Sequence, residues 1–298
     1  MATTAPANSD DYACRTYSVV AWTLRVAVAL QAIGVGLQRL GLGLEWEDDS
    51  AVFGLLLYDW RWPEEVAQRV DDLGAWLYFA CGVSLLLIPA AGGILRAITG
   101  RAGVWFSVWI WQLPLSLTVA VWQAVLTTAD WYRGGFFMSE WALISEAARF
   151  ALPLVLFVLT PLPGSDRASP SRLAGGIWLL RIAAAMTFVG HGLNSLYLNP
   201  KFVDFLLAAA AHISWDLSQS TAETVLRAIG VVDLAAAALM MLKRWRIIAF
   251  YMALWALVAA TARLVHSGPE SHFELLIRSG NYCVPLIVGL FWHLSRRK

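Results

Sequence analysis

Apolar stretches long enough to cross a bilayer constrain this chain more than any other feature of its sequence. The hydrocarbon core of a membrane is matched by about 20 consecutive apolar residues in a helix. Hydrophobic residues make up 59% of the 298 residues and charged residues 14%, whereas soluble domains carry about 25% charged residues. The sequence therefore predicts an all-α integral membrane protein, with the lipid bilayer as its main partner. We expect eight transmembrane helices, at 19–42, 73–95, 104–126, 142–161, 175–197, 223–242, 247–267 and 275–294.

An internal duplication organises these spans. The segment Arg25–Leu40, RVAVALQAIGVGLQRL, aligns with Arg181–Leu196, RIAAAMTFVGHGLNSL, 156 positions later. A second pair of matching residues lies near the end of each half, where Pro153 aligns with Pro285, 132 positions later. A repeated segment of this kind predicts a repeated structural unit. Because each unit has four helices, an even number, we expect two parallel four-helix bundles rather than inverted ones. The expected units and the linker between them are 1–162, 175–298 and 163–174.

Charged residues fall into two sets that predict the orientation of the chain. Basic residues near short loops face the cytoplasm. The basic set is Arg15, Arg96, Arg101, Arg167, Arg172, Lys243, Arg244, Arg246, Arg296, Arg297 and Lys298. The loops on the other side are acidic and include Asp48, Asp59, Glu64, Asp71, Asp130, Asp204 and Glu270. We expect a protein of the cell (inner) membrane with both termini in the cytoplasm, which agrees with an even number of spans.

The first connection of each unit, at 43–72 and at 198–222, is long and carries an apolar, aromatic stretch. Such a stretch suits a segment that lies in the membrane interface. A folded cap over the helix ends fits the same composition. The sequence leaves both interpretations open.

Polar residues gather in the outer half of the second unit, where each needs an explanation. A charge at the centre of a span costs roughly 2.5–3.5 kcal/mol on insertion scales. One interpretation is a structural network in which Asp233 pairs with Arg263 or Arg278. The other is a pocket in which an uncharged imidazole and an arginine hold the two carbonyls of a quinone. The residues favour neither over the other. The candidate site is His191, Asn194, Asp233, Arg263, His266, Arg278 and Asn281.

The matching part of the first unit is less polar. Val35 stands where the second unit would place its histidine, so a site preserved by duplication is expected in the second unit. The groups that the first unit offers are Gln38, Arg39, Glu146 and Arg149. Paired glycines occur in both units, and small residues let helices approach closely in lipid. We therefore expect helix packing to explain Gly34, Gly36, Gly190 and Gly192.

Other classes of site find little support. The cysteines Cys14, Cys81 and Cys283 form no C-x-x-C pair, so neither a dithiol centre nor a cysteine zinc site is indicated. No H-E-x-x-H, glycine-rich phosphate loop or G-x-S-x-G occurs, so metal binding, nucleotide hydrolysis and serine catalysis are not predicted. A haem between His191 and His266 is a disfavoured alternative. The net charge of +1 gives no reason to expect nucleic acid.

Two stretches resemble the DoxX family of membrane proteins, HGLNSLYLNPKFVDFLLAAA at 191–210 and IGVVDLAAAALMMLKRWRIIA at 229–249. The residues that fill the family pattern are Arg181, His191, Gly192, Leu196, Pro200, Phe202, Gly230 and Asp233. Asp233 stands where glutamate is commoner in the family. The resemblance covers roughly 175–295, and more faintly 19–160, and it implies a four-helix membrane bundle. It also implies kinship with subunits of quinone-reducing oxidoreductases, including thiosulfate–quinone enzymes. The tandem duplication departs from the family's usual single unit.

Two functional hypotheses follow. The first is a redox-associated membrane subunit that binds quinone through the polar residues of the second unit. The alternative is a non-catalytic scaffold or assembly subunit that holds other membrane or periplasmic proteins. The sequence leaves open whether the chain is an enzyme. A small-molecule transporter is disfavoured, because the repeats are parallel and the sequence shows no broken-helix signal in both halves.

Overall fold

The computed structural model describes residues 9–40, 50–99, 108–134, 141–163, 165 and 167–296. These residues contain helices and no strands. Among them, seven helical segments are long and apolar enough to cross a membrane. Six are continuous, α1 (Ser9–Arg39), α3 (Glu64–Thr99), α4 (Val108–Arg133), α7 (Pro170–Leu196), α9 (Gln219–Leu242) and α10 (Arg246–Ser267). The seventh joins α11 (His272–Ile277) to α12 (Ser279–Ser295). The chain is thus a multi-span integral membrane protein, as its composition predicts.

The predicted span at 142–161 is divided into two helices. These are α5 (Ala142–Ser145) and α6 (Ala147–Leu159), and α6 alone is a 13-residue apolar helix. The break falls at Glu146, with φ −100° and ψ 6°. The other unit has a matching break at Arg278, with φ −90° and ψ 11°, 132 positions later. The expectation that neither half carries a broken helix was therefore wrong, and the breaks precede Pro153 and Pro285, which lie inside α6 and α12.

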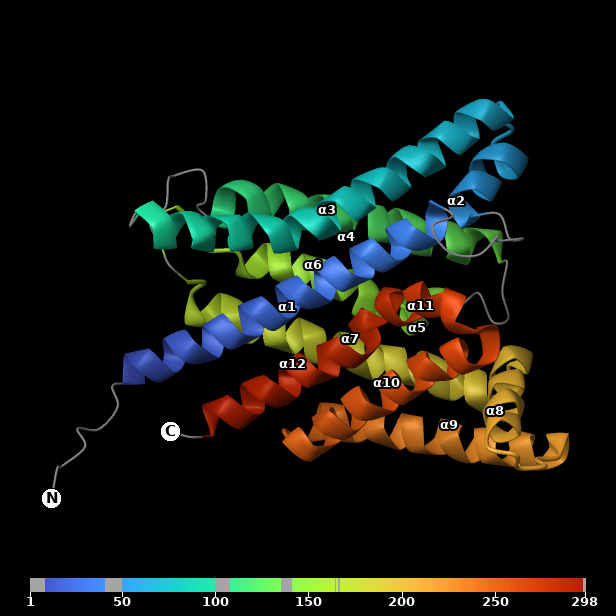
Figure 1. Cartoon of the computed structure of the whole chain (residues 1–298). Helices are drawn as coiled ribbons and strands as arrows, with labels where there is room; N and C mark the ends of the chain where they lie inside the picture. Colours follow the sequence, from blue (N-terminus) through green and yellow to red (C-terminus); the bar gives the residue numbers. More distant parts are fainter. Residues whose placement is uncertain are drawn as a thin grey trace, which may run out of the picture.

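The two units interlock through these broken helices. Helix α1 of the first unit packs against both α11 and α12 of the second, and α7 of the second packs against both α5 and α6 of the first. Within each unit, the first long helix packs on the next, α1 on α3 and α7 on α9. Figure 1 shows α12 lying beside α1 and crossing α7 in the middle of the molecule. Buried apolar residues from both units therefore form one continuous core.

Two glycines make the interlocking possible. A Cβ atom on Gly34 of α1 would lie 2.6 Å from the backbone nitrogen of Ile277, next to the break in the second unit. A Cβ atom on Gly190 of α7 would lie 2.5 Å from Ser145 Oγ and 2.8 Å from the Ser145 backbone, next to the break in the first unit. Real Cβ atoms do not approach other atoms this closely. The prediction that packing explains these glycines is confirmed, and the packing joins one unit to the other.

Hydrogen bonds also join the two units near the breaks. The first N–H groups of a helix have no partner within that helix. The backbone N–H of Ala148, in the first turn of α6, donates to Thr187 Oγ1 of α7 at 3.0 Å. At the other break, Ser279 Oγ donates to the Ala27 carbonyl of α1 at 2.8 Å. Each unit's first helix is thus hydrogen-bonded to the other unit's broken one.

Short helices occupy the connections. They are α2 (Ala51–Gly54), the π-helix η1 (Leu55–Asp59), α8 (Pro200–His212) and the 3₁₀ helix η4 (Pro269–Ser271). In α8, Val203 is buried against Ala222 and Leu226 of α9, so this connection packs on the start of α9, and the interfacial and capping interpretations both stay predictions. Of the first connection, residues 43–49 lie outside the described part of the chain. Helix α7 begins at Pro170, within the segment expected as linker, with the side chain of Ser169 as its N-cap.

Candidate functional site

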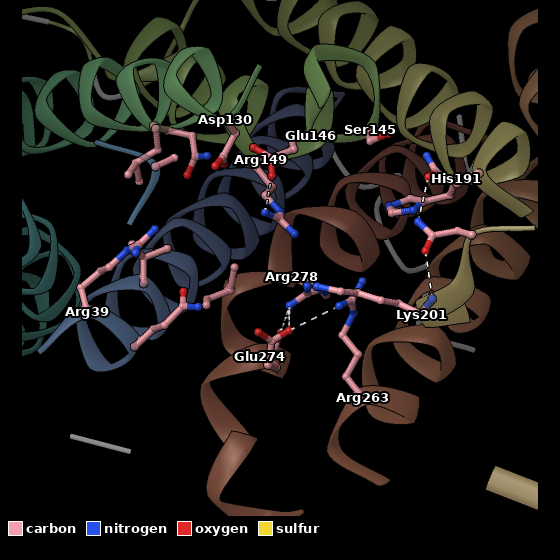
Figure 2. Close-up of a pocket in the computed structure, with 18 of the residues that line it drawn as sticks. Arg39, Asp130, Ser145, Glu146, Arg149, His191, Lys201, Arg263, Glu274 and Arg278 are labelled. Atoms are coloured by element: carbon pink, nitrogen blue, oxygen red, sulfur yellow. Dashed lines mark hydrogen bonds and ion pairs between the residues drawn. The ribbon is translucent and has the colours of Figure 1, made fainter. Parts of the chain in front are cut away.

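A charged cavity of about 590 Å³ lies between the two units. It is found where α1, α4, α7 and α10 approach their C-terminal ends and where both broken helices are interrupted. Figure 2 shows its side chains converging from both units. Its walls carry six basic side chains, Arg39, Arg133, Arg149, Lys201, Arg263 and Arg278. They carry three acidic ones, Asp130, Glu146 and Glu274. Positive charge is therefore in excess around the cavity.

Four of the seven residues predicted from the sequence line this cavity, and one supports it. The four are His191, Asn194, Arg263 and Arg278. Asn281 does not line the cavity, but its Nδ2 atom lies 3.4 Å from His191 Nε2. Asn194 Nδ2 donates to the Gly190 carbonyl at 2.9 Å, and its Oδ1 accepts from Asn199 at 3.0 Å. These bonds hold the amide in place at the end of α7.

The other two predicted residues, Asp233 and His266, do not line the cavity. Asp233 is buried on α9, and its Oδ1 atom has no hydrogen-bond partner. The predicted pairing of Asp233 with Arg263 or Arg278 is wrong. Both arginines contact the carboxylate of Glu274 instead, with Arg263 Nη1 at 3.8 Å from Oε2 and Arg278 Nη1 in direct hydrogen bond. The tertiary fold turns α9 toward α7, which leaves Asp233 outside the group.

Glu274 is the residue that sequence reasoning missed. It lies on α11, one turn before the break, and its side chain is 12% exposed. The signal was its spacing, because Glu274 and Arg278 are four residues apart and such pairs meet on one helix face. The break prevents a regular helix at this point, yet the pair still forms, since α11 ends only at Ile277.

The first unit contributes as much to the cavity as the second. Arg149 Nη1 donates to Glu146 Oε1 at 2.7 Å, and Glu146 Oε2 accepts from Thr127 Oγ1 at 2.7 Å. Arg39, the last residue of α1, lines the opposite wall, as Figure 2 shows. The polar groups that the sequence offers in the first unit therefore join those of the second, and the expected second-unit site is a site shared by both.

Three arginines meet two carboxylates at the centre of the cavity. The side chains of Arg149, Arg263 and Arg278 are 15%, 22% and 13% exposed, and their ion-pair partners are Glu146 and Glu274. The Nε atoms of Arg149 and Arg278 are buried and have no hydrogen-bond partner. Burying an uncompensated charge is costly, so the group retains capacity for a further acceptor.

A row of aromatic rings runs beside this group. The centroid of the His191 ring lies 6.0 Å from Phe202, Phe202 lies 6.2 Å from Phe205, and Phe205 lies 5.2 Å from His266. The guanidinium of Arg263 sits over the Phe205 ring at 4.9 Å. The two histidines are thus linked through two phenylalanines, and no direct ring contact joins them in the described structure. This arrangement does not favour a haem held by both.

Comparisons with protein-family models, with curated proteins and with solved structures find no match to this chain. In the described part of the chain, no group of three or more His, Cys, Asp or Glu side chains is placed to hold a metal ion.

Proposed function

We propose that this membrane protein binds a small anionic ligand, bearing a carboxylate or a phosphate, in the cavity between its two units. The observation that carries the proposal is the surplus guanidinium among Arg149, Arg263 and Arg278, which share two carboxylates. Guanidinium groups recognise carboxylate and phosphate oxygens through paired N–H donors. A bound anion would take the unpartnered donors and balance the charge.

The helix breaks add to the attraction. Helices α6 and α12 both begin beside the cavity, which Ser145, Glu146, Ile277 and Arg278 help to line. The N-terminal end of a helix carries partial positive charge and favours anions. Broken helices that point their N-termini at an anionic substrate are a feature of transporters. Transport of the bound anion is therefore consistent with the cavity, and an uptake assay in vesicles would test it.

Arg263 offers the sharpest test, because it is the surplus cation. Replacing it in Arg263→Gln leaves Glu274 paired with Arg278 and leaves Glu146 paired with Arg149. If the arginines bind a ligand, Arg263→Gln should weaken binding by about tenfold or more, with a change in stability of at most ~1–2 kcal/mol from the lost contact with Phe205. If the network is purely structural, replacing Arg263 will not change the amount of ligand that the protein binds.

The measurement is native mass spectrometry of the full-length protein, followed by identification of the small molecules released. Oleate, inorganic phosphate and decylubiquinone are then offered as probes to the wild type and to Arg263→Gln. The matched control is Arg69→Gln, whose side chain is 80% exposed on α3 in a pair with Glu65. Binding of oleate or phosphate that Arg263→Gln loses and Arg69→Gln keeps supports the proposal. Equal binding by all three proteins overturns it.

A quinone is the second candidate, and the aromatic row is the observation that favours it. Phe202 and His191 both line the cavity, so an aromatic ring and an imidazole are available to a bound molecule. Retention of decylubiquinone, with neither anion bound, would favour the quinone-binding redox subunit and remove the anion proposal. The DoxX relationship, which implies such a subunit, remains a proposal that rests on the residues from 191 to 249.

The arrangement in the membrane is part of the proposal. We infer eight crossings in two parallel units, with the α5–α6 pair as the shortest crossing and both termini in the cytoplasm. The start of α1 and the end of α12 lie at the same end of the bundle in Figure 1, and Arg172, Lys243, Arg246 and Arg296 are at helix ends on the predicted basic side. Labelling of engineered cysteines from each side tests the orientation. The assembly-subunit hypothesis also remains a prediction, and the native mass of the gently extracted complex tests it.

A further inference from the structure

A second cavity, of about 360 Å³, lies at the end of the bundle where the chain begins. It is enclosed by α1, α3 and α4 of the first unit together with Pro161. It shares no lining residue with the cavity between the units. Its walls are mostly apolar and aromatic, and the one basic side chain among them is Arg25. The site does not depend on the proposed function.

Arg25 is a buried cation without a carboxylate partner in the described part of the chain. It is 7% exposed, and its guanidinium lies 4.5 Å from the Trp22 ring and 5.3 Å from the Trp111 ring. Its Nε and Nη2 atoms both donate to one neutral oxygen, Gln112 Oε1, at 2.9 and 2.7 Å. An amide oxygen and two ring faces attract a cation but do not neutralise its charge.

The equivalent arginine of the second unit shows how such a charge is otherwise compensated. Arg181 also sits over a tryptophan, Trp178, at 4.4 Å. Its guanidinium donates to the carbonyls of Met240, Met241 and Lys243 at 2.7, 2.6 and 3.4 Å. These carbonyls belong to the C-terminal end of α9, which carries partial negative charge.

The first unit lacks this arrangement because its corresponding helix does not end there. Helix α3 continues to Thr99, so the helix end that compensates Arg181 has no counterpart beside Arg25. The cavity occupies that side of Arg25 instead, against Ile88, Pro89 and Gly93 of α3. The duplication thus left one arginine satisfied by a helix terminus and the other facing a cavity.

Two further observations point to an occupant. Trp111 lines the same cavity. Its indole Nε1 is buried and has no hydrogen-bond partner. A Cβ atom added to Gly93 would meet no other atom within 4 Å, so the cavity is open beside α3. Trp22 is 46% exposed and its counterpart Trp178 is 43% exposed, and exposed tryptophans of this kind sit at the level of lipid headgroups.

We propose that this cavity holds the phosphate of an anionic phospholipid headgroup, with Arg25 as its counter-ion and the Trp111 N–H as a hydrogen-bond donor. Basic pockets between membrane helices at the cytoplasmic side bind acidic headgroups in this way. The apolar and aromatic lining suits the glycerol and upper acyl regions of a lipid. A free phosphate ion presents the same oxygens without the apolar part, so the experiment has to separate the two sources.

The test measures lipid retention by the full-length protein with native mass spectrometry, using phosphatidylglycerol and phosphatidylcholine as probes. Arg25→Gln should reduce the retention of phosphatidylglycerol about tenfold, the loss expected for one charge-assisted contact. Gly93→Leu should reduce it similarly by filling the cavity while Arg25 stays in place. The matched control is Gly175→Leu on α7, where an added Cβ also meets no atom but no cavity wall is changed.

A second readout uses Cys14, which lines the cavity and is exposed, whereas Cys81 and Cys283 are buried. Phosphatidylglycerol should slow the reaction of Cys14 with a maleimide in the wild type and not in Gly93→Leu. Thermal unfolding of each variant shows whether it folds, and Gly93→Leu, whose added Cβ meets no atom within 4 Å, keeps the test valid if Arg25→Gln does not fold.

The proposal is overturned if Gly93→Leu retains phosphatidylglycerol as well as Gly175→Leu does, or if phosphatidylcholine is retained equally. Displacement of phosphatidylglycerol by inorganic phosphate at equal concentration assigns the cavity to a soluble anion and overturns the lipid assignment. Arg263→Gln should leave retention unchanged, because it alters only the cavity between the units. A change in phosphatidylglycerol retention by Arg263→Gln would mean that the two cavities are coupled, and it would contradict their independence.

Discussion

The two broken helices have similar backbone conformations at the break, but the residues at the two breaks carry opposite charges. The break in the first unit places a carboxylate at Glu146, and the break in the second places a guanidinium at Arg278, 132 positions later. Each break is packed by a glycine of the other unit, Gly190 or Gly34. The two breaks share their backbone geometry, which packing requires, and differ in their side chains, which packing leaves free. Because the units interlock, groups that differ between them face one shared cavity.

The largest expected effect comes from the carboxylates. Glu274→Gln leaves Arg263 and Arg278 without their shared counter-charge, whereas Glu146→Gln leaves only Arg149. Removing one partner of a buried pair costs about 3–5 kcal/mol, and all these side chains are between 12% and 22% exposed. We expect Glu274→Gln to destabilise the protein in that range and Glu146→Gln to cost less. Thermal unfolding in nanodiscs checks the order, and a smaller loss for Glu274→Gln would contradict it.

Replacing either of the two glycines that contact the opposite break should destabilise the protein by a similar amount. Gly190→Ala and Gly34→Ala each place a methyl group within 2.6 Å of the opposite break. Overpacking of this kind costs about 1–3 kcal/mol. The control is Gly175→Ala, where the added methyl meets nothing within 4 Å. If unfolding midpoints of Gly190→Ala and Gly175→Ala coincide, the interlocking contact does not contribute to stability.

The hydrogen bonds near the breaks should differ between the units. Thr187→Val leaves the backbone N–H of Ala148 buried without an acceptor, which costs about 1–3 kcal/mol. Ser279→Ala removes a donor from the Ala27 carbonyl, but Ala27 is inside α1 and its carbonyl keeps the helical bond. We expect the serine variant to lose under about 1 kcal/mol. Equal losses of stability in Thr187→Val and Ser279→Ala would show that the backbone N–H of Ala148 finds another acceptor.

The smallest effect is expected outside the network. Arg69 pairs with Glu65 at 3.6 Å, and the two side chains are 80% and 86% exposed. Exposed pairs contribute about 0–1 kcal/mol. We expect Arg69→Ala to shift the unfolding midpoint very little and to become neutral in high salt, since salt screens exposed charges. A loss comparable to that of Glu146→Gln would mean that exposure does not separate the two classes of ion pair.

Part of the candidate site could be predicted because local rules carry it. The cost of a charge in a membrane span drew attention to Arg263 and Arg278, and both line the cavity. The same rule selected Asp233, which is buried elsewhere on α9. Insertion cost identifies residues that need a partner, but it does not say which helix supplies that partner. Glu274 was missed for this reason, although it holds both arginines.

The sequence by itself determined the helical membrane class, the positions of most apolar segments and the close-packing role of the glycines. These follow from hydropathy and spacing along the chain, which are local properties. Only the tertiary structure decided that Gly34 and Gly190 pack against the opposite unit and that both last helices break. It also decided that the polar groups of both units share one cavity. The physical reason is that contacts between helices depend on rotation and depth, which a periodic apolar pattern constrains only to a face.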